Sequence, residues 1–68
     1  MPIVHVHFWE GVGKEKVKTM IRGITKVIVD LGVPEHAVKV IIHEIPKTHW
    51  GIGGEPASEK LKDISPPK

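Results

Sequence analysis

The sequence lacks several residue types, and each absence excludes a class of function. It has no cysteine, which excludes a disulfide framework, a thiolate zinc site and a cysteine nucleophile. Ten Lys+Arg against eight Asp+Glu leave a formal charge of only +2, and the lysines are spread along the chain. A basic stripe for nucleic acid is therefore not expected. At 68 residues there is room for one domain.

Long apolar runs are absent as well. The apolar residues near the start are interrupted by His5 and His7, and no basic segment precedes them. Neither a secretory signal nor a membrane anchor is therefore expected. No window approaches the roughly 18 apolar residues that a membrane span needs. These features predict a cytoplasmic protein with no membrane partner.

The remaining pattern indicates three structural elements. Residues 2–9 alternate as an extended strand with apolar residues on both faces. From Lys14 the apolar spacing changes to three and four, which predicts a helix that ends near Leu31, just before a glycine and a proline. Residues 38–45 are apolar on both faces and predict a second strand parallel to the first. The apolar stripe of the helix is expected to be core: Val17, Met20, Ile21, Ile24, Val27, Ile28 and Leu31.

This order predicts an α+β fold built from a single β-α-β unit. Residues 1–60 are expected to form the domain, and residues 61–68 a mobile C-terminal tail. Residues 47–60, with three glycines, are expected to form a turn or small hairpin. A two-stranded sheet with one face covered leaves two strand edges and one face open, so the unit is not expected to persist alone. The sequence therefore predicts a homo-oligomer.

Pro2 is the residue with the most unusual reactivity in the chain. If Met1 is removed, a cleavage favoured by a small second residue, Pro2 carries a free secondary amine with a reference pKa near ~8. Burial in an apolar pocket disfavours the charged form of such an amine, which would let it act as a general base near neutral pH. If Met1 stays, the nitrogen is an amide without basicity, and Pro2 simply begins a strand.

The chain resembles the 4-oxalocrotonate tautomerase family from Pro2 to about Lys60. The resemblance is carried by PIVHVHFWEG at the start, a helix of the same length, VKVIIHEIPK in the second strand and, most specifically, HWGIGGEPAS. It implies a tautomerase (MIF-like) fold in which subunits pair into dimers with a four-stranded sheet, usually assembled as a trimer of dimers. It also implies an isomerase that interconverts enol and keto forms of small 2-oxo acids with no metal or organic cofactor.

The resemblance also implies roles for individual residues. Pro2 matches the catalytic base, and its protonated form would be the general acid. Trp50 occupies the place of the family's pocket aromatic residue, and Trp9 occupies a position beside the active site. Both are therefore expected to bind substrate as an apolar surface that excludes water. Lys39 stands where the second arginine follows valine in the family and, contributed by a neighbouring subunit, would hold a carboxylate or polarise the oxo group. Val12 stands in place of the first arginine and retains no charge.

The missing arginine predicts a change in specificity. With Lys39 as the remaining cation, the pocket is expected to favour a monoacid with an apolar or aromatic end over a diacid. Val12→Arg is expected to restore activity on diacids. Lys14 is an alternative source of the lost cation, although solvated helix surface is the commoner role for a lysine at that position.

Other interpretations stay open. His5 and His7 share a strand face at a spacing that can bind a metal, against the simpler view that they pack at a subunit interface. His49 could border the pocket. The glycines after Trp50 are not followed by the Lys-Ser/Thr pair of a phosphate-binding loop, so they are expected to be turn glycines. Alternative functions are a hydratase or dehalogenase that uses the same proline, and a non-catalytic oligomer that binds a small ligand.

Overall fold

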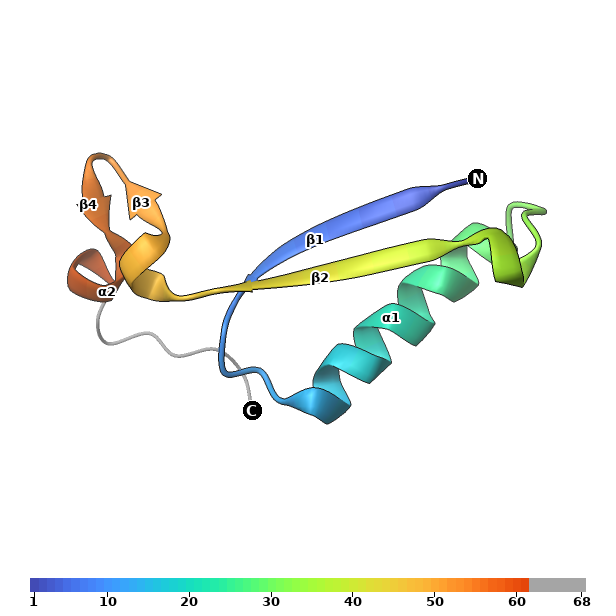
Figure 1. Ribbon diagram of the computed structural model, residues 1–68, viewed down its shortest axis with the longest axis horizontal. Helices are drawn as coiled ribbons and strands as arrows, with labels where there is room; N and C mark the ends of the chain where they lie inside the picture. The colour runs from blue at the N-terminus through green and yellow to red at the C-terminus, as the bar shows by residue number, and fades with distance from the viewer. Residues whose placement is uncertain (62–68) are drawn as a thin grey trace.

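A computed structural model describes residues 1–61 of the chain (Figure 1). Its main elements are strand β1 (Ile3–Trp9), helix α1 (Lys14–Val29) and strand β2 (Lys39–Ile45). The two strands are parallel neighbours, and α1 connects them, so the predicted β-α-β unit is confirmed. The predicted tail lies outside the described residues apart from Leu61. Within residues 1–61, no helix combines the length and the apolar composition that a bilayer crossing requires.

Helix α1 packs against β2 and covers one face of the sheet (Figure 1). It ends slightly before the predicted position, because a turn follows in which the N–H of Gly32 donates to the carbonyl oxygen of Val29 at 2.9 Å. Gly32 has a φ of +102°, a conformation that costs glycine little and side-chain-bearing residues more. A short 3-10 turn η1 (Glu35–Ala37) then leads into β2.

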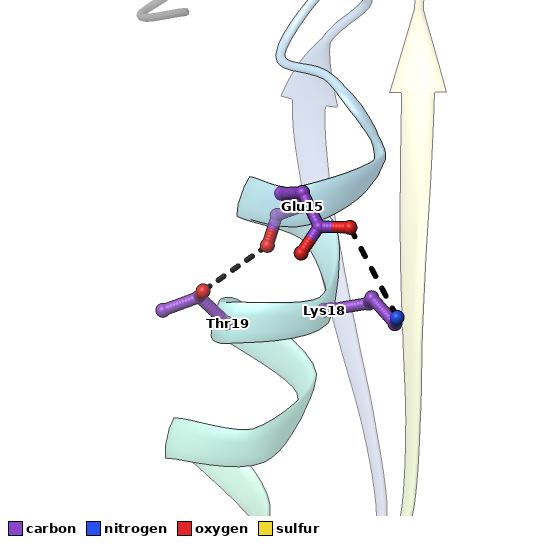
Figure 2. A network of polar contacts seen from close by, with 3 residues as sticks. All are labelled: Glu15, Lys18 and Thr19. Carbon is purple, nitrogen blue, oxygen red and sulfur yellow. Dashed lines mark hydrogen bonds and ion pairs between the residues drawn. The ribbon is translucent and has the colours of Figure 1, made fainter.

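Polar contacts on α1 lie at its solvent-exposed surface. Figure 2 shows the hydroxyl of Thr19 donating to the backbone oxygen of Glu15 at 3.1 Å, with Lys18 Nζ 4.0 Å from a carboxylate oxygen of Glu15. An exposed ion pair of this kind contributes at most about 1 kcal/mol. The position of α1 on the sheet therefore depends on its apolar face rather than on these contacts.

The apolar face of α1 is only partly covered in a single chain. The stripe residues that are half-buried are Val17, Met20, Ile24 and Ile28. Val27 and Leu31 remain 62% and 77% exposed, and no residue of α1 is fully buried. The prediction that the whole stripe is core is wrong for one chain, because two strands make too narrow a sheet to cover it.

The buried core of the described chain is very small. Val12 and Ala57 are the buried hydrophobic residues, whereas Ile3 and Ile41 on the uncovered sheet face are 56% and 41% exposed. Within residues 1–61, β1 and β2 pair only with each other, so each leaves one edge open. Open edges and an apolar open face are the features from which the sequence predicts a homo-oligomer.

A small second unit follows β2 at the far end of the sheet (Figure 1). Its elements are the 3-10 turn η2 (Lys47–His49), strands β3 (Gly51–Ile52) and β4 (Glu55–Pro56), and helix α2 (Ala57–Lys60). The predicted hairpin is confirmed as the antiparallel β3–β4 pair. Its two-residue loop, Gly53 and Gly54, has φ values of +60° and +88°, which suit a tight hairpin turn. The helical turns η2 and α2 were not expected.

Candidate functional site

Pro2 and Lys39 are neighbours at one end of the sheet. The N–H of Lys39 donates to the carbonyl oxygen of Pro2 at 3.0 Å, and Pro2 is half-buried. Met1 is 84% exposed, so the bond before Pro2 is accessible to an aminopeptidase. The ammonium of Lys39 lies 3.3 Å from the backbone oxygen of His36 and stays exposed. Strand pairing thus places the backbones of the candidate base and the candidate cation side by side within one chain.

Trp9 and Trp50 contact each other at the opposite end of the sheet. Their ring centres are 5.9 Å apart, and the rings meet edge to face at 78°. Strand pairing places Trp9 beside Ile45 at the end of β2. The carbonyl oxygen of Trp50 accepts the N–H of Ala57 at 2.7 Å, which holds Trp50 against α2. The two tryptophans therefore form one aromatic cluster at this end of the sheet.

The predicted site residues do not all meet within one chain. Seven positions separate Pro2 from Trp9 along a strand that rises about 3.3 Å per residue, which puts the two ends about 23 Å apart. Figure 1 shows the N-terminus at one end and the β3–β4 hairpin at the other. One half of the candidate site holds Pro2 and Lys39, and the other half holds Trp9 and Trp50. The predicted site residues therefore form two separate groups in one chain.

Lys47 belongs to the tryptophan half, although the sequence did not single it out. Its Nζ lies 4.7 Å from the centre of the Trp9 ring, a cation–π contact, and its side chain is half-buried. The indole N–H of Trp9 is buried and has no hydrogen-bond partner within residues 1–61. The sequence offers only a weak signal for this contact, because a lysine three positions before Trp50 does not indicate that its side chain reaches Trp9.

Val12 is a core residue rather than part of a substrate-binding wall. It is 3% exposed and lines a shallow pocket of about 410 Å³ beside α1, together with Phe8, Lys16, Thr19 and Met20. We therefore no longer expect Val12→Arg to place a cation against substrate. Lys14 lies at the exposed start of α1, and no polar contact ties it to either half of the site within residues 1–61.

His5 and His7 stack with His43, which the sequence did not connect to them. The ring centre of His43 lies 5.1 Å from that of His5 and 4.6 Å from that of His7. Nδ1 of His5 is 2.8 Å from Nε2 of His43. The rings are nearly parallel, with interplanar angles of 16° and 12°, so the three histidines form a stack. No group of three metal-ligating side chains is found in the described part of the chain. His49 instead contacts the hydroxyl of Thr48 at 3.0 Å.

Comparison with known proteins decides the family. Residues 2–60 match the family described as "Tautomerase enzyme". The chain belongs to the tautomerase family. The 2-hydroxymuconate tautomerase of Pseudomonas putida is 45% identical over 60 residues, which are 87% of this chain and 95% of the relative.

Solved structures of other tautomerase family members have the same fold. TomN, a 4-oxalocrotonate tautomerase homologue in the tomaymycin biosynthetic pathway, superposes with a TM-score of 0.84 at 31% identity, covering 90% of this chain and 95% of TomN. A heterohexamer 4-oxalocrotonate tautomerase from Chloroflexus aurantiacus J-10-fl gives a TM-score of 0.78 at 30% identity, with coverage of 87% and 97%.

The tautomerase family match and the relatives confirm two predictions from the sequence. The fold is that of a 4-oxalocrotonate tautomerase subunit, and the protein is an isomerase with tautomerase activity. The family match starts at Pro2 and ends at Lys60, so it covers both halves of the candidate site.

Proposed function

We propose that this tautomerase interconverts the enol and keto forms of small 2-oxo acids, with Pro2 as the proton carrier after removal of Met1. The observation that carries the proposal is the position of Pro2 beside Lys39 at one end of the sheet. Keto–enol exchange needs a base for the proton and a positive group for the oxygen on which negative charge develops. Relatives named 2-hydroxymuconate tautomerase support this substrate class.

The proposed reaction is a 1,3-proton shift. The neutral amine of Pro2 removes a proton from one end of the enol system, and the resulting ammonium returns a proton to the carbon at the other end. No atom is gained or lost, so no other reactant is required. Lys39 holds the carboxylate or polarises the oxo oxygen, and Trp9 and Trp50 exclude water from the reacting atoms.

Two copies of the chain complete each site in this proposal. Strand β1 has an open edge and runs from the Pro2 end to the Trp9 end of the sheet. Antiparallel pairing of two β1 edges about a two-fold axis brings Pro2 of one copy to Trp9 of the other and makes a four-stranded sheet. Three such dimers, as a hexamer, would also cover the open sheet faces. The heterohexamer relative supports this assembly.

Assembly gives a direct prediction. Because Val12 and Ala57 are the only buried residues among those that the structure describes, we expect a stable hexamer and no appreciable folded monomer at micromolar concentration. Sedimentation velocity over a dilution series, with circular dichroism on the same samples, measures this. A monomer that keeps its native spectrum at those concentrations would contradict the proposed assembly.

Turnover of two enols tests the substrate class. Ketonisation of 2-hydroxymuconate, a diacid, and of phenylenolpyruvate, a monoacid, is followed on preparations whose intact mass shows that Met1 is absent. Turnover of at least one of them supports the proposal, and failure on both contradicts it. Three expectations from the sequence stay predictions: a cytoplasmic location, a reaction without metal or organic cofactor, and the absence of nucleic-acid and membrane partners.

A further inference from the structure

Lys47 is the cation that lies against the aromatic end of the site. Its Nζ is 4.7 Å from the centre of the Trp9 ring, and Trp9 meets Trp50 at 5.9 Å. The ion pairs found within residues 1–61 involve other lysines, so no carboxylate from this part of the chain neutralises Lys47. Lys47, a residue of intermediate exposure, therefore places its ammonium against an aromatic ring without a counter-ion from the described residues.

The tryptophan cluster also offers hydrogen-bond donors without acceptors. The buried indole N–H of Trp9 has no partner within residues 1–61, and the ammonium of Lys47 can only donate. The indole N–H is too deeply buried to meet a ligand in this conformation, whereas a lysine ammonium beside aromatic rings favours a ligand with a negatively charged oxygen. The ring faces of Trp9 and Trp50 favour a flat, unsaturated body next to that oxygen. A carboxylate at the end of an unsaturated chain combines both features.

We infer that Lys47 binds the remote carboxylate of a diacid substrate, so that specificity is set by two lysines from two copies of the chain. This inference rests on the proposed function, because antiparallel β1 pairing brings the tryptophan half of one copy to Pro2 and Lys39 of the other. Lys39 then binds the carboxylate and oxo group next to the reacting carbon. Lys47 replaces the cation that Val12 lacks, and the monoacid preference expected from Val12 is reversed.

Lys47→Gln tests the inference by comparing two substrates. We expect kcat/KM for the diacid 2-hydroxymuconate to fall by about 10-fold or more, mainly through KM, because a charge-assisted contact to substrate is lost. For the monoacid phenylenolpyruvate we expect a change of less than about 2-fold, since it has no remote carboxylate. Lys47→Arg should keep most of the diacid activity, and Lys14→Gln, which removes an exposed cation, should leave the ratio of the two rates unchanged.

The outcomes separate substrate binding from packing. Equal losses on both substrates would mean that Lys47 only supports the Trp9 ring, and an unchanged ratio would overturn the inference outright. A failure of the proposed function looks different, because Pro2→Ala would then leave both rates unaltered.

A second measurement needs no variant. The inhibition constant of the saturated diacid adipate for the wild-type enzyme should be at least about 10-fold lower than that of the monoacid hexanoate at low salt, because adipate makes one more charge-assisted contact. Equal inhibition constants for the two would overturn the inference.

Discussion

Replacing Pro2 with alanine lowers kcat/KM by at least about 100-fold, the usual contribution of a positioned general base. Alanine leaves a primary amine on a more flexible backbone, whereas the proline ring fixes the nitrogen at the start of β1. The 3.0 Å hydrogen bond from the N–H of Lys39 uses the carbonyl oxygen of Pro2, which alanine retains, so strand pairing is expected to stay unchanged. Initial rates of ketonisation measure the loss, on a preparation shown by intact mass to lack Met1.

Retention of Met1 provides a control for the Pro2 prediction. A wild-type preparation that keeps Met1 has an amide nitrogen at Pro2 and should lose the same activity without any change of side chain. Circular dichroism and sedimentation on both preparations check that fold and assembly are retained, so that the loss of activity can be assigned to the nitrogen of Pro2. Full activity with Met1 in place would rule out Pro2 as the proton carrier.

Val12→Arg lowers the free energy of unfolding by about 3 kcal/mol or more, the size of effect expected when a charge replaces a buried apolar side chain. Val12 is 3% exposed, and its pocket is lined by Phe8, Lys16, Thr19 and Met20. The ammonium of Lys16 has the same sign as the new guanidinium, so it offers no compensation. Urea unfolding at a fixed chain concentration measures the change.

Val12→Ala is the matched control for size without charge. It should cost about 1 to 2 kcal/mol, from the lost burial of two methyl groups at about 0.8 kcal/mol each. Neither substitution is expected to raise activity on a diacid relative to a monoacid. If Val12→Arg were as stable as wild type and gained diacid activity, Val12 would line the substrate pocket and Lys47 would lose its assigned role.

The main elements could be predicted from the sequence because their patterns are local. Alternation over residues 2–9 and the helical spacing from Lys14 each depend on neighbours a few positions away, and the structure shifts the ends by only one or two residues. The hairpin at Gly53 and Gly54 could also be predicted, since both glycines adopt the positive φ that a two-residue turn demands.

Features that depend on pairing between distant segments could not be predicted. His43 joins His5 only because β2 lies beside β1 in one particular register. Lys47 reaches Trp9 for the same reason, with η2 turning the chain back at the end of β2. The burial of Val12 and the exposure of Val27 likewise depend on which part of the sheet α1 covers. Periodicity indicates which residues are apolar, but not which of them a narrow sheet can bury.

The division of the site between the two ends of β1 is tested most directly by complementation between one variant from each half, both of which we expect to have lost most activity. Pro2→Ala and Trp50→Ala are co-expressed with different C-terminal tags, and mixed assemblies are purified through both tags. If two copies share each site, random pairing about a two-fold axis restores both native residues in about a quarter of the sites. We therefore predict roughly a quarter of wild-type activity. Activity no higher than that of the separate variants would contradict the shared site.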